Sequence, residues 1–185
     1  RVALTRLRHT IGAHAVQRLD GGYVMAPTAD VDAQRFEDLL RTGSDSAITV
    51  SHRLKMLDDA VGLWNGSAFA GLDAWDWSVP EAVRLDELLE QAIDLRFELR
   101  MDRGEDIVSE LIADLRRQPT RERRVEMLAT TLYRTGRQTD ALSEIQRTRR
   151  LLRDGYGLSM GPALCSLETR ILEHDPTLTA PSTAP

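Results

Sequence analysis

The chain has 185 residues, of which 42% are hydrophobic and 29% are charged, and this composition is typical of globular proteins rather than disordered or fibrous ones. No stretch approaches the roughly 18 consecutive apolar residues of a membrane-spanning helix, and the start of the sequence shows no signal-peptide pattern. The single cysteine, Cys165, cannot form an internal disulfide, so we expect a cytoplasmic protein with no membrane partner.

The net charge of −5 is unevenly distributed along the chain. Residues 1–24 carry four arginines and one aspartate, whereas residues 25–118 carry ten basic and twenty acidic side chains. Residues 119–153 are basic again, with nine arginines and four acids. A uniformly acidic chain would not show this pattern, so the basic leading segment requires its own explanation.

The leading segment predicts a helix followed by a β-hairpin. Residues 1–12 (RVALTRLRHTIG) place Leu4, Leu7 and Ile11 on an inner face, and Arg1, Thr5 and Arg8 on another. Residues 13–27 (AHAVQRLDGGYVMAP) predict a hairpin with Asp20–Gly21 at its tight turn.

A basic helix followed by a short hairpin is typical of the carboxyl end of a winged-helix domain. In such domains the helix lies in the major groove and the hairpin, or wing, touches the adjacent DNA backbone. Arg6, Arg8 and Arg18 would then neutralise phosphates or contact base edges. The alternative is a surface helix with ordinary solvated arginines.

The rest of the chain reads as helices separated by short breaks. Helical periodicity with start or stop residues is found over 31–43, 51–64, 78–100, 119–133 and 161–176. We expect a threonine cap after Pro119, and Leu164, Leu167, Ile171 and Leu172 facing inward in the last helix. Cys165 falls within that apolar stripe, which predicts a buried packing role rather than a nucleophile.

An aromatic loop interrupts this pattern at residues 65–79 (NGSAFAGLDAWDWSV). We expect Trp75 and Trp77 to fold back as a lid on the helical core, with a ligand site as the less favoured alternative.

Residues 100–111 and 134–145 repeat with a period of 34. Arg100, Arg103, Asp106 and Glu110 correspond to identical residues at 134, 137, 140 and 144. This period is typical of tetratricopeptide (TPR) helix–turn–helix units, in which a glycine ends the first helix and a small residue allows a close crossing. Gly136 and Ala141 fit those two roles, and Asp102 falls at the position of Gly136.

Several blocks in this order resemble the bacterial transcriptional activation domain of the Streptomyces antibiotic regulatory protein (SARP) family. They include LTRLRHTIG, GGYVM, VDAQRFEDLL, LDDAVGLWNG, the long stretch 119–152, YGLSMGPAL and RILEHDPTL. The resemblance implies TPR-like helix pairs placed after an OmpR-type winged helix, and a regulator that binds promoter repeats and recruits RNA polymerase.

The resemblance also assigns residues to roles. Thr5, Arg6 and Arg8 match the later part of the recognition helix, Gly22 and Tyr23 match the wing, Asp32 and Phe36 match the entry to the helical domain, and Gly136, Arg137 and Ala141 match a turn. The chain departs from the pattern at Arg18 (commonly threonine), Met160 (commonly proline, so a looser turn is expected) and Asp102 (commonly glycine).

We therefore predict an all-α fold of TPR-like antiparallel helix pairs, preceded by the last helix and the hairpin of a winged helix. The expected divisions are 1–26 (truncated winged helix), 27–177 (activation domain) and 178–185 (linker or tail). Expected DNA-binding residues are Arg1, Thr5, Arg6, Arg8, Arg18 and Tyr23. Expected partners are promoter DNA and RNA polymerase, with self-association left open. Because the leading strands and first helices of a winged helix are missing, we expect weak or no specific DNA binding from these residues alone.

No motif for catalysis, a metal or a cofactor accompanies these features, which predicts a protein that is not an enzyme and holds no cofactor. Two alternatives to an activator remain: a TPR-like protein-interaction scaffold, and a regulatory segment of a larger signalling protein with a following ATPase or sensor domain. The basic run Arg147, Arg149, Arg150 and Arg153 is a candidate protein- or DNA-facing surface, although an ordinary solvated helix flank is the favoured reading.

Overall fold

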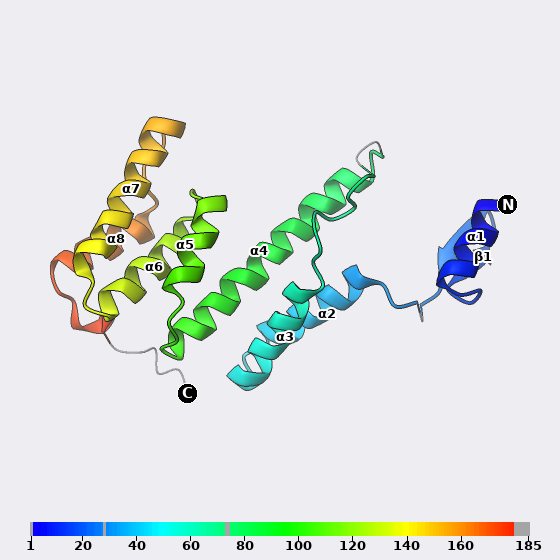
Figure 1. Ribbon diagram of the computed structural model, residues 1–185, viewed down its shortest axis with the longest axis horizontal. Helices are drawn as coiled ribbons and strands as arrows, with labels where there is room; N and C mark the ends of the chain where they lie inside the picture. The colour runs from blue at the N-terminus through cyan, green and yellow to red at the C-terminus, as the bar shows by residue number, and fades with distance from the viewer. Residues whose placement is uncertain (1, 28, 73–74, 180–185) are drawn as a thin grey trace.

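The computed structural model describes residues 2–27, 29–72 and 75–179 (Figure 1). In this part the chain forms α1 (Val2–Ile11), β1 (Val16–Leu19), β2 (Gly22–Met25), α2 (Asp32–Ser44), α3 (Val50–Gly62), α4 (Ser78–Asp102), α5 (Val108–Arg117), α6 (Glu122–Arg134), α7 (Gln138–Tyr156), α8 (Pro162–Leu172) and a 3-10 turn at Pro176–Leu178. The predicted helical fold with a leading helix and hairpin is confirmed. None of the helices described is long and apolar enough to span a bilayer.

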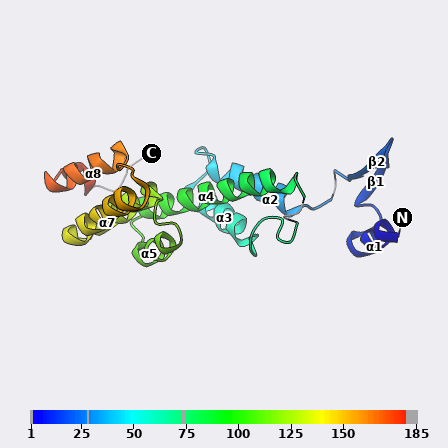
Figure 2. The same cartoon turned by 90° about the horizontal axis from the view of Figure 1, so that it is seen from above.

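The leading segment forms a small unit, which we call the head (residues 2–26). Strands β1 and β2 pair antiparallel with Leu19 opposite Gly22, so Asp20 and Gly21 make the turn as predicted. Gly21 has a φ of +91°, a backbone conformation that glycine adopts without strain. A linker joins the head to the helices that follow, and Figures 1 and 2 show the head at one end of the molecule.

Helix α4 is the central element of the helical body (residues 32–178). Its 25 residues run through the middle of the molecule, with α2 and α3 on one part of it and α5 to α8 beyond its other end (Figure 1). A helix that packs on both sides needs apolar residues on more than one face. Leu85 and Ala92 accordingly face α2 and α3, whereas Phe97 faces the carboxyl-terminal helices.

Two hydrophobic cores result. The amino-terminal core is small and includes Phe36, Leu57, Ala60 and Ala92. The carboxyl-terminal core is larger, with residues from α4 to α8 that include Leu111, Leu128, Ala141, Ile145, Leu164 and Ile171, all fully buried. Leu178, the first residue of the segment expected to be a tail, is also buried in this core.

The turn after α6 has the expected geometry, but its counterpart after α4 lies at a different residue. Gly136 has a φ of +78°, and its N–H donates to the Tyr133 carbonyl at 2.9 Å. The same pattern occurs at Gly104, which has a φ of +72° and donates to the Met101 carbonyl at 3.0 Å. Asp102 remains inside α4, so the idea that it replaces the turn glycine is wrong.

Three further local expectations are corrected. Helix α6 begins at Glu122 without a side-chain cap, so Thr120 does not cap it. Leu172 is 58% exposed because it lies beyond the buried face formed by Leu164, Leu167 and Ile171. Cys165 is exposed rather than packed. Met160 is buried in the carboxyl-terminal core.

The aromatic loop also folds differently from the expected lid. Trp75 and Trp77 are 58% and 56% exposed, so neither covers the core. The residues that do close the amino-terminal core are Trp64 and Phe69, which are half-buried against it. Trp64 packs edge-on against Phe36 with 5.5 Å between the ring centroids.

Candidate nucleic-acid interface

The head presents its basic side chains from α1 and from the hairpin. Helix α1 is short, and its apolar side chains are only partly covered: Leu4 is half-buried, while Leu7 and Ile11 are 44% and 40% exposed. The hairpin is fixed next to the helix mainly through Val16, which is 5% exposed. Ala26 extends the pairing by donating its N–H to the Ala15 carbonyl at 2.8 Å.

Arg8 is half-buried and joins α1 to the hairpin. Its Nη2 donates to the Val16 carbonyl at 2.8 Å and its Nε donates to the same oxygen at 3.3 Å. The guanidinium also lies over the Tyr23 ring, 5.9 Å from the centroid, within the range of a cation–π contact. Arg8 thus holds the hairpin against the helix, a positioning role that the sequence did not indicate.

Arg18 and Tyr23 share one face of the hairpin. They lie directly opposite each other in the β-ladder, and residues in that relation project to the same side. Both side chains are exposed, and Tyr23 is 54% accessible. Because Arg8 contacts Tyr23, this face is the one adjacent to α1, so Arg18 is brought close to the basic helix.

The remaining predicted residues lie on α1. Arg6 is exposed, and its carbonyl accepts the Thr10 hydroxyl at 3.0 Å within the helix. Thr5 is exposed one residue before it. Arg1 lies outside the described residues. The structure therefore places Arg6, Arg18 and Tyr23 on one small, solvent-accessible unit, with Arg8 as the link between them.

The basic run of α7 is mostly paired with acids of the same body. Arg149 pairs with Glu168 of α8, Arg153 with Asp154 at 2.7 Å, and Arg147 with Glu144 at 3.6 Å. These contacts favour the solvated helix flank over a second basic interface, because each acid offsets charge that a phosphate would otherwise meet.

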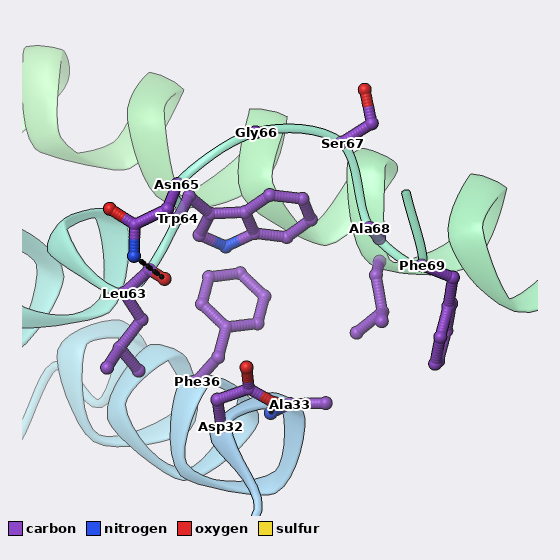
Figure 3. Close-up of a pocket in the computed structure, with 11 residues that line it drawn as sticks. Asp32, Ala33, Phe36, Leu63, Trp64, Asn65, Gly66, Ser67, Ala68 and Phe69 are labelled. Carbon is purple, nitrogen blue, oxygen red and sulfur yellow. Dashed lines mark hydrogen bonds between the residues drawn. The ribbon is translucent and has the colours of Figure 1, made fainter. Parts of the chain in front are cut away.

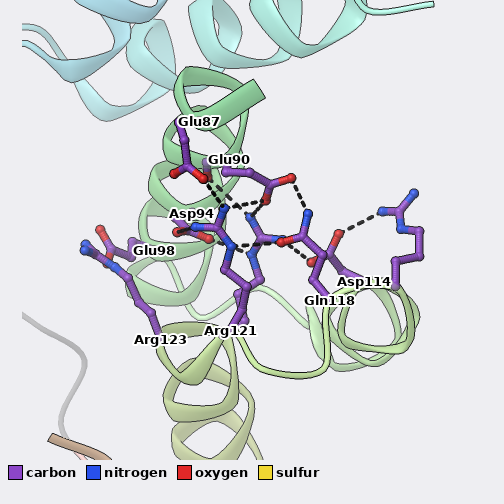
Figure 4. Close-up of polar contacts among 10 residues, drawn as sticks. Glu87, Glu90, Asp94, Glu98, Asp114, Gln118, Arg121 and Arg123 are labelled. Atoms are coloured by element: carbon purple, nitrogen blue, oxygen red, sulfur yellow. Dashed lines mark hydrogen bonds and ion pairs between the residues drawn. The ribbon is translucent and has the colours of Figure 1, made fainter. Parts of the chain in front are cut away.

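Sequence reasoning missed a buried charge cluster in the helical body. Arg124 of α6 is completely buried, and it forms ion pairs with Asp94 and Glu90 of α4, at 2.6 Å and 2.5 Å, and with Asp114 of α5. Figure 4 shows the acids and Gln118 gathered around the arginines, and Arg121 adds a second positive charge at 3.7 Å from Glu90. The cluster therefore joins three helices, α4, α5 and α6.

The electrostatics of this cluster favour the charged arginine. Burial by itself would lower the pKa of Arg124 because it penalises the charged form. The hydrogen bond that Arg124 donates to Asp94 and the negative charges of Asp94 and Asp114 more than offset this, so the pKa of Arg124 lies above its ordinary value. The only signal in the sequence was an arginine in the apolar register of a helix, which by itself does not name its partners.

The described residues contain no cluster of three or more histidine, cysteine or acidic side chains arranged to hold a metal ion. The basic head is therefore the candidate interface that the geometry supports.

Comparison with known proteins identifies the family. A model of the bacterial transcriptional activator domain matches residues 31–172 of the chain. The chain belongs to this family. Its relatives are SARP-type regulators, as the sequence blocks predicted.

Among these relatives, the regulatory protein AfsR of Streptomyces coelicolor is 35% identical over 190 residues, which cover the whole chain and 19% of AfsR. The transcriptional regulator RedD of the same organism is 32% identical over 88% of the chain and 47% of RedD. The solved structure of Mycobacterium tuberculosis EmbR, in complex with a low-affinity phosphopeptide, has a TM-score of 0.83 at 25% identity. The structural match covers 96% of the present chain and 51% of the EmbR chain. The chain thus spans about a fifth of AfsR and about half of RedD and EmbR.

Proposed function

We propose that the chain is part of a cytoplasmic transcriptional activator that binds promoter DNA through its head and recruits RNA polymerase through its helical body. In this proposal residues 1–26 are the carboxyl end of a winged helix, residues 27–177 are the activation domain, and residues 178–185 are a linker or tail whose first residue, Leu178, packs into the core of that domain.

One observation carries the proposal. The matches with AfsR and EmbR extend over 100% and 96% of the chain, so they include the basic head together with the helical body. A match limited to the body, such as residues 31–172, would support an interaction scaffold equally well. The match over both parts favours a DNA-binding regulator in which the head and the helical body act together.

The exposed apolar residues of the head support the winged-helix assignment. Leu7, Ile11, Leu19 and Val24 are each at least 40% exposed, which is unusual for so small a unit. Further strands and helices of a winged-helix domain would cover such a surface.

The roles of the predicted residues follow from their positions. Arg6 and Arg18 are exposed arginines of the helix and the wing, so we assign them phosphate or base contacts. Thr5, on the same helix, is assigned a contact in the same groove, and the same role is proposed for Arg1 from the sequence alone. Tyr23 is assigned a backbone contact beside Arg18, and Arg8 is assigned the positioning of the wing.

The test is a salt-dependent DNA titration of the full-length protein and its Arg6→Ala/Arg18→Ala variant, followed by fluorescence anisotropy. Each lost phosphate contact reduces the slope of log K against log salt by about 0.9, so the double variant should lose about 1.8. An equal slope in both proteins would refute the assignment.

A matched control uses two exposed arginines of the body, Arg41→Ala/Arg103→Ala, which remove the same formal charge. We expect the control to keep the wild-type slope. A reduction equal to that of the head variant would show that net charge, rather than the head, determines DNA affinity.

A further inference from the structure

The start of α4 carries an exposed apolar surface that packing within the chain does not use. Trp75 and Trp77 are 58% and 56% exposed, and Val79 and Val83, one helical turn apart on α4, are 51% and 58% exposed. We call these four residues the tryptophan surface. Isolated exposed apolar residues are common, but two tryptophans and two valines gathered at one helix end mark an interaction site.

This surface is held in place by an aromatic contact. Trp77 packs edge-on against Phe69, with 5.3 Å between the ring centroids. Phe69 has a φ of +53°, a conformation that costs free energy for a bulky residue and persists only where its surroundings impose it. Trp77 thus contacts the loop 63–69 through Phe69 while more than half of its own surface stays exposed.

Phe69 also lines a cavity next to the tryptophan surface. The cavity has a volume of about 400 Å³ and lies between the start of α2, the loop 63–69 and Leu85 of α4. Figure 3 shows the Trp64 ring above Phe36 on one side of this space and Phe69 on the other. The aromatic side chains and Leu85 give part of its wall an apolar lining that suits an apolar side chain, whereas Asp32, Asn65 and Ser67 make the rest polar.

The charges around the tryptophan surface are negative. Residues 75–87 contain four acids, Asp76, Glu81, Asp86 and Glu87, and one base, Arg84, but Glu87 belongs to the charge cluster, where it lies 3.7 Å from Arg121. Arg84 is neutralised by ion pairs with Glu81 at 2.5 Å and Glu37 at 2.7 Å, and the hydrogen bonds that Arg84 donates to these two carboxylates raise its pKa above the ordinary value. Asp76 and Asp86 are exposed beside the apolar residues. This charge repels DNA and anionic lipid, and it attracts a basic partner.

We infer that the tryptophan surface and the adjacent cavity bind a basic amphipathic helix of a partner protein, with one apolar side chain of that helix in the cavity. Three features match this occupant: tryptophans at the centre of the surface, a pocket for an anchoring side chain, and acids at the rim that face basic residues of the partner. The inference concerns the helical body alone, so it does not depend on DNA binding by the head.

The test measures binding of labelled 14-residue peptides to the 185-residue chain by fluorescence anisotropy. One peptide is a helix of leucine and arginine with leucines at i, i+3, i+4 and i+7, the second is a scrambled peptide of the same composition, and the third replaces arginine by glutamate. The basic amphipathic peptide binds at least about tenfold more tightly than either of the others. Equal binding of the scrambled peptide would show a non-specific charge effect and overturn the inference.

Two exposed positions test the location without affecting the fold. Trp75→Ser and Val83→Ser each lower the affinity for the basic amphipathic peptide about tenfold or more, because contacts at the centre of an interface dominate affinity. Leu158→Ser, an apolar residue that is 57% exposed after α7, serves as the matched control and leaves the affinity unchanged.

Sedimentation equilibrium of the same variants decides between occupants. The chain has the same association state with and without Trp75→Ser. If Trp75→Ser dissociates an oligomer, the tryptophan surface binds a second copy of the chain and the inference is overturned. The inference is also overturned if neither Ser variant changes the affinity for the peptide.

Discussion

The two halves of the helical body share α4 but complete their packing in different ways. The carboxyl-terminal half has a large core and closes around the buried Arg124, which joins α4, α5 and α6. The amino-terminal half has a smaller core, closed by Trp64 and Phe69, and leaves tryptophans exposed at the start of α4. The carboxyl-terminal half is thus stabilised by buried ion pairs and apolar packing, whereas the amino-terminal half combines apolar packing with an exposed apolar surface.

This difference indicates a division of tasks along a single helix. A buried cation with three acidic partners allows few alternative arrangements, because any displacement leaves a charge without its counter-charge. An aromatic loop at a helix end has fewer such constraints. The carboxyl-terminal half accordingly fixes the shape of the body, and the amino-terminal half carries the exposed apolar residues that we propose as the surface for a partner.

The largest expected effect concerns the charge cluster. Replacement of Arg124 by Ala leaves Glu90, Asp94 and Asp114 without their buried cation, and removing one side of a buried pair costs about 3–5 kcal/mol. We therefore expect the free energy of unfolding, measured with urea, to fall by about this amount. Arg147→Ala, which removes an exposed arginine 3.6 Å from Glu144, should change it by less than about 0.5 kcal/mol. Similar losses of unfolding free energy in the two variants would show that the cluster does not stabilise the carboxyl-terminal half.

A smaller effect is expected at the crossing of α2 and α3 in the other half. A Cβ added at Gly43 would lie 2.7 Å from Cγ of Leu57, which is fully buried and cannot move freely. Gly43→Ala should therefore destabilise the chain by about 1–3 kcal/mol, measured by thermal unfolding.

Gly62, at the end of α3, is the matched control for this substitution. A Cβ there meets nothing within 4 Å, so Gly62→Ala should leave stability unchanged or raise it by up to about 1 kcal/mol. If Gly43→Ala is equally tolerated, the amino-terminal core is looser than its close helix crossing implies.

The smallest expected effect is a pH dependence in the carboxyl-terminal half. Burial raises the pKa of the Glu126 carboxyl, the neighbouring Glu122 raises it further, and Arg123 opposes both. The folded state then binds a proton more tightly than the unfolded state, so this residue favours folding as the pH falls through its raised pKa and opposes folding above it.

Glu126→Gln removes this titration, and we expect a small gain in stability at pH 7, below about 1 kcal/mol. The gain should shrink as the pH approaches the ordinary value of 4.5, followed by urea unfolding over a pH series. A gain in Glu126→Gln that is constant with pH would exclude the carboxyl charge as its cause.

The sequence predicted most of the elements because their signals are local. Apolar spacing and turn residues placed the helices within a few residues, and Asp20–Gly21 located the hairpin. The 34-residue period also held for the second helix of each repeat, since Ile107, Leu111, Ala141 and Ile145 are all fully buried.

The same period misplaced the first turn. The left-handed glycines of the two repeats lie 32 residues apart, at 104 and 136, whereas the aligned buried residues Ile107 and Ala141 lie 34 residues apart. Gly104 therefore precedes Ile107 by three residues, and Gly136 precedes Ala141 by five. Identical residues at a constant spacing gave no sign of this difference, because they do not mark the residue at which the first helix ends.

The sequence alone determined the class of this protein: helical pairs behind a basic helix and hairpin, with blocks that identify its family. Tertiary structure decided which side chains meet. Arg8 binds the hairpin, and Arg124 forms ion pairs with acids that are 10 to 34 residues away in the sequence. Trp75 and Trp77 remain exposed where a lid was expected. Helical periodicity fixes which face of a helix a residue lies on, but the partner across that face comes from another helix, whose position depends on how all the helices pack together.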